Sequence, residues 1–315
     1  MIITIDFRFN QKENVYELFD NFILKYAPEI EEIDYSFKFE KRIVTSFQQI
    51  PYDDFDEISI TLNQGTIWIQ QMQNLLPRIC FYQVNKGYYE TVLNFVDTHF
   101  VEKISYGTVH EALDELLQNT DKLGAWRRKK RLLPDYVNVL PNPIYTNEME
   151  KEIVSIESLP GHSHQMGYDD KLWFGSCWQM YISPVYYKYI PKPLFDDFED
   201  CYEHVVFENG LRKITLYESI EDYDLPENRA RQWAFRKQLG IDSIAHELTK
   251  ANNRIEPLNL PVLITKQNCK VGQTRVTRFL DDNNKLVSSD NAIKKEIKEY
   301  LDDGITIVHE EIELM

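Results

Sequence analysis

Two hairpin signals constrain the fold of this chain most strongly. Apolar and polar residues alternate over Ile58–Leu62, a turn signal stands at Asn63–Gly65, and the alternation continues over Ile67–Ile69. Asn209-Gly210, between two further apolar runs, is the strongest short-range hairpin signal in the sequence. Residues joined by such short turns pair as antiparallel neighbours. The sequence therefore predicts antiparallel or mixed sheets.

Helical spacing of apolar residues appears between these strands. Further strands are predicted over Met1–Phe9 and Arg78–Gln83. Helices are predicted over residues 15–23, about 108–131, 224–240 and 290–304. The third helix has clear start and stop signals, with Asp224 as N-cap, Pro226 in its first turn and Gly240 just beyond its end. Together these elements indicate an α+β fold, with helices packed on antiparallel or mixed sheets.

A run of prolines indicates a domain boundary. Pro134, Pro141 and Pro143 interrupt one short segment, and the interior of a helix or strand does not tolerate this density. We expect two subdomains of α+β type. Their predicted limits are 1–133 for the N-terminal domain, 134–148 for a Pro-rich linker and 149–315 for the C-terminal domain.

The charge of the chain limits its partners. Asp and Glu number 51 against 35 Lys and Arg, which gives a net charge of −16 and a pI near 4.9. Such a surface repels phosphates and steers basic proteins into contact. We therefore expect no direct nucleic-acid binding. No stretch approaches the roughly 18 apolar residues that span a bilayer, and the opening lacks a basic, cleavable leader.

The cysteines indicate a reducing compartment. Cys80, Cys177, Cys201 and Cys269 are scattered without paired spacing, which argues against a disulfide framework or a zinc site. We expect a cytoplasmic protein with no membrane segment and no cofactor.

Two acidic clusters with an aromatic residue among the acids are candidate partner-binding sites. Carboxylates could grip Lys or Arg of a basic partner while the aromatic ring serves as an apolar anchor; the alternative is a solvated loop. The candidate residues are Asp53, Asp54, Phe55 and Asp56 in the first cluster, and Asp196, Asp197, Phe198, Glu199 and Asp200 in the second.

An H-x-H pair is the candidate metal site. His162 and His164 on an extended segment project both imidazoles to one face and can supply two ligands. Asp169, Asp170 or His204 could complete a hydrolytic zinc or iron site. The structural alternative is a pair of polar anchors in a glycine-bounded loop.

A dense aromatic stretch is the candidate ligand-binding site. Trp173, Trp178 and Tyr181 could stack on a sugar, a base or a partner, or form part of the core. Within this stretch, Gly175–Trp178 resembles the segment around the nucleophile of papain-like cysteine proteases. That resemblance would make Cys177 a nucleophile and His309 its base, but Phe174 replaces the first cysteine of the family pattern.

These observations favour a non-catalytic, acidic protein-interaction module. In general character the chain is similar to immunity proteins that neutralise bacterial toxins, which implies occlusion of a basic toxin by carboxylates. The alternatives are a metal-dependent hydrolase that uses the His162/His164 loop and a ligand-binding module built on the aromatics between Trp173 and Tyr189.

Overall fold

The computed structural model has an α+β fold with antiparallel sheets and packed helices, arranged in two compact units. Unit 1 comprises Met1–Leu116, Cys177–Ser183 and Val205–Tyr223, and unit 2 comprises Leu117–Ser176, Pro184–His204 and Asp224–Met315. The structure describes residues 1–10, 14–16, 19–20, 22, 30–38, 40–51, 55–71, 76–121, 144–146, 152–154, 159–165, 172–249 and 259–315. The predicted linker lies outside the described residues apart from residues 144–146, so the predicted boundary stays a prediction.

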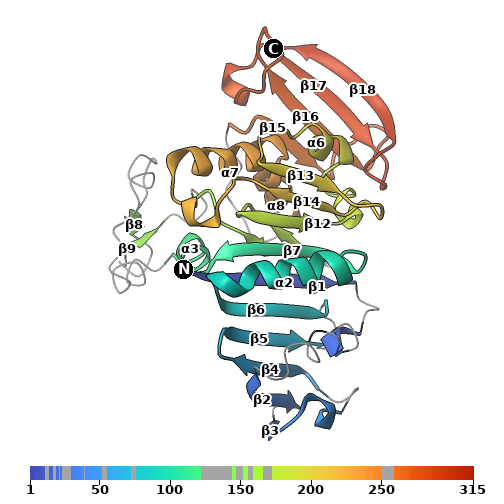
Figure 1. Ribbon diagram of the computed structural model, residues 1–315. Coiled ribbons are helices and arrows are strands. Elements are labelled where there is room, and N and C mark those ends of the chain that lie inside the picture. The colour runs from blue at the N-terminus through green and yellow to red at the C-terminus, as the bar shows by residue number, and fades with distance from the viewer. Residues whose placement is uncertain are drawn as a thin grey trace. The chain divides into compact units, whose positions relative to one another are not determined.

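Unit 1 is built on a ten-stranded sheet (Figure 1). Its strand order is β13-β14-β12-β7-β1-β6-β5-β4-β2-β3. The strands are β1 (Ile2–Phe9), β2 (Ile30–Phe37), β3 (Glu40–Val44), β4 (Glu57–Leu62), β5 (Gly65–Gln70), β6 (Arg78–Asn85), β7 (Ile104–Glu111), β12 (Gln179–Ile182), β13 (Glu203–Val206) and β14 (Arg212–Thr215). This confirms both predicted hairpins, the opening strand and the strand that begins at Arg78.

The N-terminal strand occupies the middle of this sheet, between β6 and β7. Phe7 on β1 faces Gly107 on β7, and Gly107 also faces Tyr181 on β12. A Cβ atom at position 107 would lie 2.4 Å from the Phe7 ring, so only glycine leaves room for it. The two rings meet edge-to-face with centroids 5.3 Å apart. The absence of a side chain at one position thus lets two buried rings pack across three strands.

One helix that covers the sheet was not predicted. Helix α2 (Lys86–His99) packs on β1 and β6, as Figure 1 shows. Its buried residues, Tyr88, Val92, Phe95 and Val96, recur at helical spacing and face the sheet. Within the predicted helix over residues 15–23, the described residues 15–16, 19–20 and 22 are helical, and Val15, Phe19 and Phe22 are buried.

The predicted start of the helix near residue 108 is wrong. Residues 104–111 form β7, which is buried along almost its whole length, and α3 (Ala112–Gln118) begins only after it. A strand covered on both faces shows no polar–apolar alternation, so its residues continue the apolar pattern of the helix that follows. The Glu111 carboxylate accepts a hydrogen bond from the Asp114 amide at 2.7 Å and marks the true helix start.

Unit 2 contains a four-stranded antiparallel meander, where a final helix was predicted. Its strands are β15 (Val262–Thr265), β16 (Thr274–Leu280), β17 (Lys294–Tyr300) and β18 (Ile307–Leu314). The predicted helix over 290–304 is wrong. Ile293, Ile297, Tyr300 and Leu301 have helical spacing, yet Ile293 and Leu301 are exposed. Glu299 is fully buried because the amides of residues 270–272 and Arg275 bond its carboxylate.

The other helices and strands of unit 2 precede this meander in the sequence. They are α6 (Lys192–Asp196), α7 (Pro226–Gln238), α8 (Ile241–Thr249) and the short strands β8 (Ile144–Thr146), β9 (Glu152–Val154), β10 (His164–Gln165) and β11 (Trp173–Phe174). Helix α7 confirms the third predicted helix, although Leu225 rather than Asp224 is its N-cap. Gly240 follows it with φ +64°, a left-handed conformation that glycine adopts without strain.

Candidate functional site

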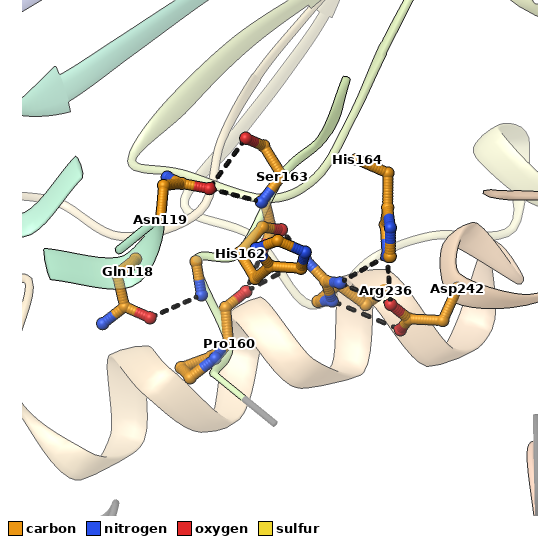
Figure 2. Close-up of polar contacts among 10 residues, drawn as sticks. Gln118, Asn119, Pro160, His162, Ser163, His164, Arg236 and Asp242 are labelled. Atoms are coloured by element: carbon orange, nitrogen blue, oxygen red, sulfur yellow. Dashed lines mark hydrogen bonds and ion pairs between the residues drawn. The ribbon is translucent and has the colours of Figure 1, made fainter. Parts of the chain in front are cut away.

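The H-x-H segment lies in a polar cluster within unit 2. His162 precedes β10 and His164 begins it, and their rings meet edge-to-face with centroids 4.9 Å apart (Figure 2). The His164 Nε2 atom lies 3.0 Å from Asp242 Oδ1. The same nitrogen lies 3.3 Å from Arg236 Nη2, so it faces both an acceptor and a donor. The two histidines thus share one cluster, in which His164 is directed at an acid.

Arg236 and Asp242 face each other because of the tight connection between two helices. Arg236 lies in the last turn of α7 and Asp242 in the first turn of α8, on either side of Gly240. The side chain of Arg236 has no solvent exposure. Its Nη2 atom donates to Asp242 Oδ1, and its Nε atom donates to Oδ2 at 3.3 Å. The guanidinium therefore holds both oxygens of this carboxylate.

Arg236 also fixes the histidine segment. Its Nη1 atom donates to the carbonyl oxygens of His162 and, at 3.4 Å, of Pro160. From the other side, Gln118 Oε1 accepts from the Gly161 amide at 3.0 Å, and Asn119 Oδ1 accepts from the Ser163 amide at 2.8 Å. Figure 2 shows these contacts together. The segment is thus held by the end of α3 and by the α7–α8 corner.

The electrostatics of the cluster follow from one buried cation. Burial alone would raise the pKa of Asp242, but Arg236 and His164 hold it well below its usual range. Burial lowers the pKa of His162 to about 3, and the neighbouring His164 and Arg236 act in the same direction. His162 is therefore a neutral imidazole at pH 7, and its buried Nδ1 atom has no hydrogen-bond partner among the described residues.

In this cluster, hydrogen bonds and an ion pair hold the histidine segment to the α7–α8 corner, and this differs from an open metal-coordination site. The acid nearest the histidines is already neutralised by Arg236, whose fixed positive charge stands where a metal would supply one. Among the described residues, no group of three or more His, Cys, Asp or Glu side chains is arranged to hold a metal ion. Of the predicted third ligands, residues 169–170 lie outside the described part of the chain. Metal binding by His162 and His164 stays a prediction.

The sequence analysis missed Arg236 and Asp242. They are more than 70 residues from His162 and carry no motif with it. The available signal was Gly240, which predicts a helix end, with Arg236 shortly before it and Asp242 shortly after it. Each charge lies where the helix dipole favours it.

Cys177 lies beside a histidine other than the one proposed. It is buried two residues before β12 in unit 1, and its Sγ atom donates to the Gln179 carbonyl at 3.1 Å. His110 on β7 hydrogen-bonds to Cys177, whereas His309 lies on β18 of unit 2 and contacts Glu311. Burial would lower the pKa of His110, but Cys177 and Glu115 raise it to about 9.

The three predicted ligand-binding aromatics lie mostly in the interior. Tyr181 is fully buried, and its hydroxyl donates to Asp97 at 2.7 Å. Trp178 is 8% exposed, and its ring nitrogen donates to the Tyr217 carbonyl at 2.8 Å. Trp173 on β11 is half-buried. A stacking role for these rings stays a prediction, and the described contacts are those of core residues.

The first acidic cluster is described only in part. Asp53 and Asp54 lie outside the described residues. Phe55 is 5% exposed, so its ring belongs to the core of unit 1. The Asp56 carboxylate accepts from the Lys38 amide at 2.7 Å and closes a turn. Phe55 and Asp56 therefore both make contacts within the fold.

The second acidic cluster, which we call the acidic turn, comprises residues 196–200 at the end of α6. Phe198 is 1% exposed and packs edge-to-face on Phe235, so its ring anchors the turn in the core. The four acidic residues are exposed. The pairs Asp196–Lys192, Asp197–Arg278 and Asp200–Arg231 lie within 2.6, 3.7 and 3.5 Å. The structure thus presents carboxylates on a rigid base.

Comparisons with known proteins add little to this geometry. No protein-family model matches the sequence, and no curated protein matches it. Among the solved structures, Pseudomonas aeruginosa T6SS protein PA0821 matches with a TM-score of 0.42 and 10% sequence identity, over 77% of this chain and 74% of that chain. A likeness at this level carries no information on function. Within the described residues, no helix is both long and apolar enough to cross a bilayer.

Proposed function

We propose that this chain is a non-catalytic, cytoplasmic protein-interaction module that binds a basic protein partner through the acidic turn. The observation that carries the proposal is the placement of four exposed carboxylates, Asp196, Asp197, Glu199 and Asp200, on a turn fixed by the buried Phe198 ring. A preorganised group of like charges steers an oppositely charged partner and raises its association rate.

The cations that already flank the turn do not oppose this role. Asp196, Asp197 and Asp200 keep 42, 54 and 58% of their side-chain surface exposed while paired. Exposed ion pairs contribute about 0–1 kcal/mol each, so partner cations can share or replace them at small cost. Occlusion of a basic toxin, as immunity proteins perform it, is the form of partner recognition that we propose.

Capture of the partner tests this function. The tagged chain is incubated with native lysate in low salt and again in about 1 M salt, where the Debye length falls to roughly 3 Å. We expect one basic protein to be retained at low salt and released at high salt. That protein is then purified, and its association rate with the chain is measured by stopped flow.

Two charge-matched variants decide where the partner docks. The first carries Asp196→Asn, Asp197→Asn, Glu199→Gln and Asp200→Asn. The control neutralises four exposed acids of unit 1 by Glu31→Gln, Glu32→Gln, Glu90→Gln and Glu102→Gln. Unit 1 is the fair control because it carries the larger excess, with 23 acidic against 11 basic side chains. We expect the first variant to associate at least tenfold more slowly than the control at low salt; equal rates would remove the acidic turn from the interface.

A further inference from the structure

Among the described residues, the last strand of unit 2 has one edge without a partner strand. β18 lies at the end of the order β15-β16-β17-β18, and among the described residues it pairs with β17 alone. The strand is eight residues long. Natural proteins usually shorten, charge or cover such an edge, because its free amide and carbonyl groups can pair with another chain.

This edge also exposes large apolar side chains. Ile312 is 67% exposed and Leu314 is 86% exposed. They lie two residues apart on one strand and so project from the same face of the sheet, beside Glu296 and Lys294 of β17. Two neighbouring aliphatic side chains at this exposure are unfavourable in water and suit the apolar part of an interface.

The charges on β18 define what can pair with it. Glu310, Glu311 and Glu313 are partly exposed, and each pairs on the inner side with a lysine of the same unit. A strand added at the outer edge would place its side chains about 4.5–5.5 Å from these acids. In a second copy of β18 paired antiparallel about its centre, glutamate would face glutamate. Like charges directly opposite are destabilising, which disfavours self-association and favours a cationic strand.

We propose that the free edge of β18 binds an extended segment of a partner protein that adds a strand to the meander. The segment carries Lys or Arg opposite Glu310, Glu311 and Glu313, and apolar side chains opposite Ile312 and Leu314. Backbone hydrogen bonds supply affinity, and the alternation of side chains supplies specificity. The acidic turn takes no part in this contact, so the two proposals can fail independently.

Two labelled synthetic peptides test the edge. The first has the sequence Thr-Val-Lys-Val-Lys-Lys-Thr, which places lysines and valines as the proposal requires for antiparallel pairing. The second has glutamate in place of each lysine. Fluorescence anisotropy with the full chain measures both. We expect the lysine peptide to bind at least tenfold more tightly and to slow amide hydrogen exchange along β18. Equal affinities of the two peptides would overturn the proposal.

Two variants locate the binding. Ile312→Thr with Leu314→Thr keeps strand propensity but removes the apolar contacts, and we expect it to weaken the lysine peptide at least fivefold. The matched control is Ile43→Thr, an isoleucine that is 69% exposed on edge strand β3 of unit 1. The fourfold acidic-turn variant should bind the peptide normally.

Three results would contradict this location. The first is unchanged binding by the Ile312→Thr/Leu314→Thr variant. The second is loss of peptide binding in the acidic-turn variant alone. The third is a dimer in sedimentation that the Ile312→Thr/Leu314→Thr variant abolishes, which would assign the edge to a second copy of the chain.

Discussion

Two histidines, one in each unit, have pKa values that are shifted in opposite directions. His110 in unit 1 has a pKa raised to about 9, although burial opposes the charged form, because Cys177 and Glu115 lie beside it. His162 in unit 2 has a pKa lowered to about 3, because burial acts together with the neighbouring His164 and Arg236. The comparison teaches that the neighbouring groups, and not burial alone, decide the sign of the pKa shift.

The two histidines therefore make stability depend on pH in opposite ranges. A raised pKa stabilises the folded state below the unfolded value of about 6.5 and loses that contribution as the pH rises toward the folded value. A lowered pKa means that the unfolded state binds the proton more readily, so stability falls as the pH drops below about 6.5. Unit 1 should be sensitive to alkali at His110, and unit 2 to acid at His162.

The largest effect is expected from Arg236→Met, which removes the guanidinium that bonds Asp242 and the His162 carbonyl. Asp242, which is largely buried, would keep only its contact with His164 and lose the guanidinium that bonds both of its oxygens, at a cost of about 3 kcal/mol. Urea unfolding at pH 7 measures the loss. The control is Lys237→Met on the same helix, an exposed position where about 0.5 kcal/mol or less is expected. If Arg236→Met lowers the free energy of unfolding as little as the control does, the Arg236 contacts do not stabilise the fold.

The next effect is the alkaline loss at His110. Between pH 6.5 and 9 the wild-type chain should lose roughly 3 kcal/mol of unfolding free energy through this group, at 1.36 kcal/mol per pKa unit. His110→Gln should be less stable at pH 6.5 and should show a flatter profile above it. Urea unfolding at the two pH values gives both numbers. Parallel profiles of the two proteins would mean that His110 is not protonated in the fold.

A smaller effect is expected at His162 on the acid side. At pH 5 the folded chain should be about 2 kcal/mol less stable than at pH 7, because the unfolded histidine gains a proton that the folded one excludes. His162→Gln keeps a polar side chain of similar reach and should remove most of this difference. If the variant loses as much between pH 7 and pH 5 as the wild type does, the depressed pKa is refuted.

The smallest effect on stability, about 1 kcal/mol, is expected from Cys177→Ala, which sharpens the comparison by removing one neighbour of His110. The pKa of His110 should fall, because the interaction with Cys177 that helps to raise it is gone. Titration of the imidazole carbon-bound protons by NMR measures this. An unchanged pKa would assign the shift to Glu115 and Asp114 instead.

Local patterns predicted those elements whose signals are local. The alternation around Asn63–Gly65, the Asn209-Gly210 turn and the punctuation of α7 each lie within a few residues, and the structure has a hairpin or helix at each. The errors arose where burial comes from distant strands. β7 lies inside the ten-stranded sheet between β1 and β12, and even its polar residues Ser105, Thr108 and His110 are buried.

The candidate site shows the same limit more sharply. The H-x-H spacing selected His162 and His164, and the structure places their rings together. Nothing near them in sequence indicates Arg236 or Asp242, which reach them only through the α7–α8 corner. The failure to predict β17 has a similar cause. Glu299 can be buried only because amides 27–29 residues away in the sequence donate hydrogen bonds to its carboxylate.

The order of strands also sets an order of events during synthesis. The β15–β18 meander joins neighbours in sequence, so it can form as soon as its own residues leave the ribosome. β1 is made first but pairs with β6 and β7, whose residues follow some 70 to 110 positions later. The apolar first strand must therefore wait for its partners, and it is the segment most exposed to chaperones or to misfolding in a nascent chain.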